Sequence, residues 1–122
     1  MYKNIEMQQM IKALSKYLDR KDMLGYAAAR NTRILTFELM EFENIRDELI
    51  LKYGEPELDE EGNPSDQITL KVDSPKFKDF VEEIDKFAFV EHDPSLFKIK
   101  PEHVIGELSG TEIMEIDWMI ED

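Results

Sequence analysis

Metal binding or acid–base catalysis in this 122-residue sequence would have to begin from its two histidines and 28 acidic residues. Glu91, His92 and Asp93 lie together before Pro94, and His103 follows further along the chain. A metal site needs three or four ligands that converge in space. Asp and His beside a proline turn more commonly cap the turn or face water. We therefore expect no metal ion and no other cofactor.

The acidic segment 55–66 raises the separate question of a calcium loop. Placing Gly62 at the sixth position of an EF-hand loop puts Glu57 first and Ile68 twelfth. That loop requires Asp first and a bidentate Glu last. The segment therefore predicts a solvated, mobile acidic loop.

Nucleophilic chemistry lacks its usual residues. The chain has no cysteine, no glycine-rich phosphate loop and no Gly-x-Ser-x-Gly turn. Carboxylate pairs such as Glu82 with Glu83, or Glu112 with Glu115, are expected by chance among 28 acidic residues. We predict a protein that is not an enzyme and has no small-molecule substrate.

Basic residues near the first chain reversal are the more informative set. Five of them flank a bend between two expected helices: Lys16, Arg20, Lys21, Arg30 and Arg33. One interpretation is a solvated tip facing acidic residues of the same chain, which the weakness of surface ion pairs favours. The other is a docking patch for an acidic partner or a second copy, with Arg30 and Arg33 as the strongest candidates.

Apolar spacing predicts two helices around this bend, over residues 4–20 and 26–53. Gly54 and Pro56 end the second helix. At 1.5 Å per residue the helices measure roughly 25 and 42 Å, and they form an antiparallel hairpin. The far half of the longer helix, including Phe42 and Tyr53, then extends beyond its partner. The C-terminal half of the chain or another subunit must cover it.

Shorter elements follow the acidic segment. Alternation predicts strands at 68–72 and 97–100, and Ser74 with Pro75 predicts the start of a helix between them. A Ser-x-x-Glu capping box at Ser109 predicts a final helix. It carries Trp118 and Met119, which we interpret equally as core or as contact residues. The expected fold is therefore α+β, a long helical hairpin followed by a small antiparallel sheet and two further helices.

Charge is distributed unevenly along the chain. The net charge is −13, with +1 over residues 1–54 and −14 over residues 55–122. An anionic surface repels phosphate backbones, so direct nucleic-acid binding is not expected. No apolar run approaches the ~18 residues of a membrane span, and no signal segment is visible. We expect a cytoplasmic protein without membrane contact.

Three segments together resemble a family of small proteins encoded by phages and prophages of Gram-positive bacteria. They are Ala-Arg-Asn-Thr-Arg-Ile-Leu at 29–35, the run from Leu49 to Asn63, and the late stretch from Leu108 to Ile120. That family has no assigned biochemical function. The resemblance implies a phage setting, near structural or tail-assembly genes, with entry into the virion as an alternative to a purely cytoplasmic location. It implies no catalytic residue.

The sequence as a whole predicts one domain over 1–122, divided into a helical hairpin (1–54), an acidic mobile loop (55–66) and a mixed half (67–122). We expect a non-catalytic interaction or assembly factor that binds a protein or its own copies. The expected contact residues are Arg20, Lys21, Arg30, Arg33, Phe42, Tyr53, Trp118 and Met119. The alternative is an acidic decoy that mimics nucleic acid and occupies a host protein.

Overall fold

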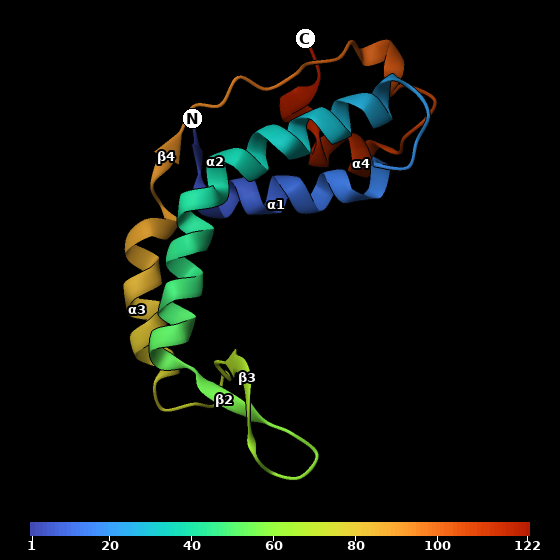
Figure 1. Cartoon of the computed structure of the whole chain (residues 1–122). Coiled ribbons are helices and arrows are strands. Elements are labelled where there is room, and N and C mark those ends of the chain that lie inside the picture. Colours follow the sequence, from blue (N-terminus) through green and yellow to red (C-terminus); the bar gives the residue numbers. More distant parts are fainter. The chain divides into compact units, whose positions relative to one another are not determined.

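The structure, a computed structural model, describes all 122 residues. It contains four α-helices and two two-stranded antiparallel sheets, which confirms the α+β prediction. The chain forms two compact units. The first contains residues 1–39 and 91–122, and the second contains residues 40–90. Figure 1 shows the elements of each unit, coloured along the sequence.

The helical hairpin is the frame of the first unit. Helix α1 (Asn4–Leu14) continues into the 3₁₀ turn η1 (Ser15–Tyr17). The 31-residue helix α2 (Met23–Tyr53) follows, and its first part lies side by side with α1 (Figure 1). The helix predicted over residues 4–20 extends six residues beyond the end of α1 and three beyond the end of η1, and α2 starts three residues before its predicted start at Tyr26.

The early start of α2 is explained by Asp22. Its carboxylate accepts a hydrogen bond from the backbone N–H of Gly25 at 3.1 Å, which satisfies one of the free donors of the first helical turn. A Cβ atom at Gly25 would lie 2.0 Å from the carbonyl oxygen of Arg20. The first turn of α2 can therefore pack against the preceding turn only because a glycine occupies this position.

The core of the first unit lies between α1, the first part of α2 and the C-terminal segment. Helix α4 (Gly110–Glu115) and the 3₁₀ turn η3 (Asp117–Met119) close it from the C-terminal side. Its buried residues come from α1, η1, the first part of α2, η3 and the segments that flank the 3₁₀ turn at 101–103 and follow α4: Met7, Met10, Leu14, Tyr17, Leu24, Ala27, Ala28, Leu35, Leu39, Ile99, Val104, Ile116 and Met119. Burial of these side chains is the main stabilising contribution to this unit.

The C-terminal part of the first unit agrees only in part with prediction. The capping box is confirmed, because Ser109 Oγ accepts from Glu112 N and Glu112 accepts from Ser109 N. The strand expected at 97–100 is absent. Only Ile99 pairs there, in an isolated parallel bridge with Ile120, and the 3₁₀ turn η2 (Pro101–His103) follows.

A small sheet that the sequence did not predict ties the N-terminus into the same unit. Strand β1 (Tyr2–Lys3) pairs antiparallel with β4 (Glu91–His92). His92 Nδ1 lies 3.1 Å from Glu38 Oε2 on α2, so β4 is also tied to the helix.

The second unit consists of residues 40–53 of α2, a β-hairpin and helix α3 (Phe77–Ala88). Helix α3 lies alongside this part of α2 (Figure 1). Phe42 and Leu49 on α2 are buried, with 7% and 9% of their surface exposed. The overhanging half of α2 is thus covered by the chain itself, which was one of the two expected alternatives.

The β-hairpin replaces the loop expected at 55–66. Strand β2 (Glu55–Leu58) pairs with β3 (Pro64–Thr69), with Glu55 opposite Thr69 and Pro56 opposite Ile68. Asp59 organises the turn, because its Oδ1 accepts from the N–H groups of Glu61 and Asn63. Gly62 adopts a φ of 83°, in the left-handed region that glycine tolerates. Strand β3 also starts and ends earlier than the strand expected at 68–72.

Candidate functional site

A stripe of basic and aromatic residues lies on the exposed side of α2 in the first unit. Tyr26, Arg30, Arg33 and Phe37 follow one another at spacings of three and four residues, so they share one side of the helix. The buried residues of the same helix, such as Ala28 and Leu35, fall on the opposite side at about 100° per residue. We call these four residues, together with the neighbouring Phe97, the Arg30 face.

Arg30 lies over the ring of Phe97 and is hydrogen-bonded to the hydroxyl of Tyr26. Its guanidinium carbon lies 5.3 Å from the centre of the Phe97 ring, and its Nη1 donates to Tyr26 Oη at 3.2 Å. Tyr26 and Phe97 meet edge to face, with ring centres 5.4 Å apart. The cation–π contact and the hydrogen bond together restrict the conformation of the exposed Arg30 side chain and leave its other N–H groups without a partner in the protein. Arg30 is therefore pre-positioned to receive a carboxylate.

Phe97 is placed under Arg30 by a buried amide on the other side of α2. Asn31 is fully buried, its Nδ2 donates to Phe97 O at 2.8 Å, and its Oδ1 accepts from Phe97 N at 2.7 Å. This double hydrogen bond reproduces the pairing that a neighbouring strand would give the Phe97 backbone. Asn31 is thus a positioning residue for the Arg30 face.

The exposed part of the face has the composition of a contact surface. Phe37 is 72% exposed and Tyr26 is 53% exposed. No carboxylate lies within ion-pair distance of Arg30 or Arg33. Tyr, Phe and Arg are the residues enriched in protein–protein interfaces. The sequence identified both arginines, but it did not select Tyr26, Phe37 or Phe97 as contact residues.

The other basic residues of the predicted cluster behave differently. Arg20 forms ion pairs with Asp22 at 2.6 Å and with Glu107 at 2.9 Å, and Lys16 pairs with Glu115 at 2.9 Å. The hydrogen bond to Asp22, followed by that to Glu107, raises the pKa of Arg20. Arg20 and Lys16 therefore pair with acidic residues of the same chain, as the first of the two interpretations expected. Lys21 is exposed.

Phe42 and Tyr53, also expected as contacts, belong to the second unit. Phe42 is buried, so it is not accessible to a partner, and that expectation is wrong. Tyr53 is half-buried, and its hydroxyl donates to Glu83 Oε1 on α3 at 2.6 Å. Lys52 Nζ lies 3.3 Å from the same oxygen. Tyr53 thus fastens α3 to α2.

This contact predicts a measurable change in the titration of Glu83. The Tyr53 hydrogen bond, and then that of Lys52, lowers the pKa of Glu83. We expect Tyr53→Phe to raise the pKa of Glu83 toward its ordinary value, because the carboxylate loses its strongest donor. In the native protein this contribution to stability is present above the unfolded pKa of Glu83 and is lost as the pH falls through the folded one.

The measurement is a carbon-detected NMR titration of the Glu83 side chain. Tyr26→Phe removes a tyrosine hydroxyl in the other unit and serves as the control, with no change expected at Glu83. An unchanged Glu83 titration in Tyr53→Phe would contradict the assigned contact.

Met119 and Trp118, the last two expected contacts, have different positions. Met119 is fully buried in the core and its expectation as a contact residue is therefore wrong. Trp118 is half-buried and packs against the core, and one side of it borders a groove. Trp118 therefore combines both interpretations that the sequence left open.

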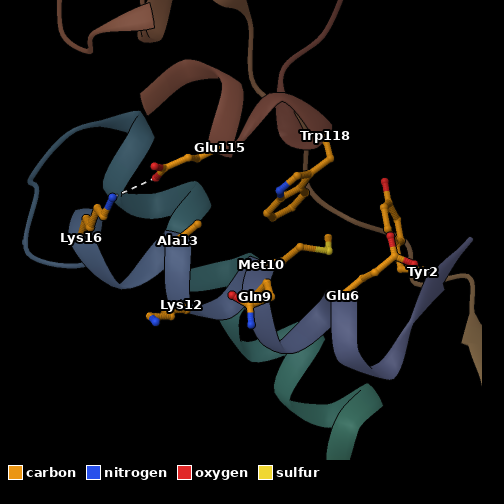
Figure 2. A pocket seen from close by; sticks show the side chains of 9 residues that line it. All are labelled: Tyr2, Glu6, Gln9, Met10, Lys12, Ala13, Lys16, Glu115 and Trp118. Carbon is orange, nitrogen blue, oxygen red and sulfur yellow. Dashed lines mark hydrogen bonds and ion pairs between the residues drawn. The ribbon is translucent and has the colours of Figure 1, made fainter. Parts of the chain in front are cut away.

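The groove at Trp118 lies between α1 and the C-terminal segment and has a volume of about 570 Å³. Figure 2 shows Tyr2, Met10 and Trp118 gathered toward one end, and the Lys16–Glu115 ion pair at the other. Its lining combines apolar side chains with charged ones from α1, including Glu6 and Lys12. It brings together no nucleophile with an adjacent base.

The histidines are not brought together. His92 pairs with Glu38, and His103 Nε2 lies 4.0 Å from Glu102, its neighbour in sequence. No group of three or more His, Asp or Glu side chains has a geometry that would hold a metal ion.

Comparisons with known proteins give no relative for this chain. No protein-family model matches the sequence, and no curated protein or solved structure is significantly similar. The resemblance to phage-encoded proteins therefore stays a prediction. No helix is both long enough and apolar enough to cross a membrane.

Proposed function

We propose that this chain is a non-catalytic interaction factor that binds another protein molecule through the Arg30 face. The single observation that carries the proposal is the pair of exposed aromatic residues, Tyr26 and Phe37, on the side of α2 opposite the core. Two arginines without carboxylate partners lie between them. Aromatic anchors flanked by Arg are the residues that most often dominate binding energy in interfaces.

The proposed setting is the assembly of a phage particle in the cytoplasm of its host. Its support is the sequence resemblance to phage and prophage proteins at 29–35, a segment that contains Arg30 and Arg33 of the Arg30 face. Binding through a few exposed side chains on a rigid helix suits an accessory role in which the partner is later released.

The test is affinity capture from lysogenic cells with three baits, compared by quantitative mass spectrometry. The baits are the native chain, Phe37→Glu, and Ile105→Glu, where Ile105 is 68% exposed and lies outside the face. We expect a protein enriched by the native bait to be lost with Phe37→Glu and retained with Ile105→Glu. Equal enrichment by all three baits would contradict the role of the face.

An acidic decoy is the second candidate function, and the charge of the second unit favours it. Residues 40–90 contain 15 Asp or Glu and 6 Lys or Arg, a net charge of −9. A decoy of this kind should lose its host target steeply as salt rises, because its contacts are ionic. Capture that survives high salt would argue against the decoy and for apolar anchors.

A further inference from the structure

We infer that the partner of the Arg30 face is the acidic β2–β3 hairpin of a second copy of this chain. The inference rests on the proposed function, because it names the occupant of the same face. The face offers two arginines between two exposed aromatic rings. Its complement must therefore offer carboxylates beside an exposed apolar side chain.

The hairpin carries that complement. Residues 55–69 contain six carboxylates and no Lys or Arg: Glu55, Glu57, Asp59, Glu60, Glu61 and Asp66. Leu58, next to the turn, is 67% exposed. Every residue of β2 is exposed, and β2 and β3 pair only with each other, so the outer edge of β2 and the tip of the hairpin are accessible.

The tip also has a defined shape, which lowers the entropy lost on binding. Asp59 N donates to Asn63 O at 2.8 Å, and Gly62 N donates to Asp59 O at 3.0 Å. Glu60 and Glu61 therefore project from an ordered turn. Arg30 is ordered by its aromatic platform on the other side of the contact. The carboxylates of the tip and the guanidinium of Arg30 are therefore both positioned before binding.

The two surfaces differ, so the contact joins copies head to tail. Each copy keeps one free face and one free hairpin after a first contact, and the association continues into a ring or an open chain. A contact built on a few exposed ion pairs is weak. We therefore expect a rapid equilibrium between monomers and short oligomers that shifts with concentration and ionic strength.

Charge reversal on each surface gives a test with an internal rescue. Arg30→Glu/Arg33→Glu makes the face acidic, and Glu60→Lys/Glu61→Lys makes the tip basic. In the first variant both the face and the tip are acidic, and in the second both are basic. Copies of either variant alone therefore repel one another at this contact and should be monomeric. An equimolar mixture restores opposite charges across every contact between the two variants and should associate again.

Sedimentation velocity up to about 1 mM protein measures these states. The native chain should exceed its monomer mass of 14.4 kDa as concentration rises, and return to it when salt shortens the screening length to about 3 Å. We expect the association constant to fall about tenfold or more in each variant. Circular dichroism confirms that the variants, altered only at exposed positions, remain folded.

The matched control reverses two exposed lysines elsewhere, Lys78→Glu/Lys86→Glu on α3, and changes net charge by the same amount as the face variant. It should associate almost as the native chain does. A native chain that stays at 14.4 kDa at every concentration would overturn the inference, as would a monomeric mixture of the two variants. A monomeric native chain that still loses a captured protein with Phe37→Glu would overturn the inference and leave the proposed function standing.

Discussion

Replacing Asn31 by alanine is expected to destabilise the first unit by about 2–5 kcal/mol, because two backbone groups of Phe97 lose their hydrogen bonds. Asn31 is fully buried and makes both bonds itself, at 2.8 and 2.7 Å. Water cannot replace a fully buried amide without a rearrangement of the core. Urea unfolding followed by the fluorescence of Trp118, the only tryptophan, reports on this unit directly.

Thr36→Ala is the control for Asn31→Ala on the same helix, since Thr36 is exposed and makes no comparable contact. Its effect should stay within about 0.5 kcal/mol. Asn31→Asp separates hydrogen bonding from packing. The variant keeps the shape and the acceptor for Phe97 N, but its ionised form has no donor for Phe97 O. Equal stability of the native protein and Asn31→Ala would contradict the assigned role.

Asn31→Asp has a predicted pH dependence. Burial favours the neutral acid, which raises the folded pKa of the new carboxyl above its unfolded value. The protonated form can donate to Phe97 O and the ionised form cannot. The stability of the variant relative to the native protein should therefore rise as pH falls through that folded pKa.

Leu35→Ala is expected to cost about 2–5 kcal/mol, the range for removing a buried leucine side chain and leaving a cavity. Leu35 is fully buried between α2 and the rest of the first unit. Phe37→Ala, two residues later, removes more atoms from a side chain that is 72% exposed. It should change the free energy of unfolding by less than about 1 kcal/mol.

The same urea titrations compare Leu35→Ala with Phe37→Ala. Similar destabilisation by the two changes would show that Phe37 is packed within the fold, and would remove the main support for the Arg30 face. A large loss of unfolding free energy in Leu35→Ala, without one in Phe37→Ala, would show that Phe37 does not contribute to stability.

Periodicity predicted the helices because local spacing decides which side of a helix is apolar. Both parts of α2 follow the expected run, and the capping residues of α4 were identified correctly from Ser109 and Glu112. The same reasoning missed the β1–β4 pairing. Its two strands have two residues each and lie far apart in the sequence, and nothing local to Tyr2 or His92 signals so distant a partner.

The hairpin at 55–69 was missed for a different reason. Glu, Asp, Pro and Gly all disfavour strands, so composition predicts a loop there. Main-chain pairing and the Asp59 turn outweigh that preference. Sequence patterns report the preferences of side chains, whereas this hairpin is held by hydrogen bonds of the backbone, and the composition therefore did not predict it.

Only the charged residues of the candidate site were predicted from the sequence. Arg30 and Arg33 were selected for their charge, but Asn31 and Phe97, which position Arg30, were not selected. Asn31 could have been found, because a polar residue in step with Leu24, Ala28 and Leu35 must be buried with a partner. Phe97 could not, because its position under Arg30 depends on a hydrogen bond between residues 66 apart in the sequence.

The most direct measurement of the central claim is site-specific photo-crosslinking in cells that carry the gene. A benzoylphenylalanine residue replaces Phe37 in one strain and Ile105, which is 68% exposed, in another. The account predicts a discrete covalent adduct from position 37, with a second copy or another protein, that disappears when Arg30→Glu/Arg33→Glu is added. No adduct from position 37, or equal adducts from both positions, would contradict the claim that the Arg30 face is a contact surface.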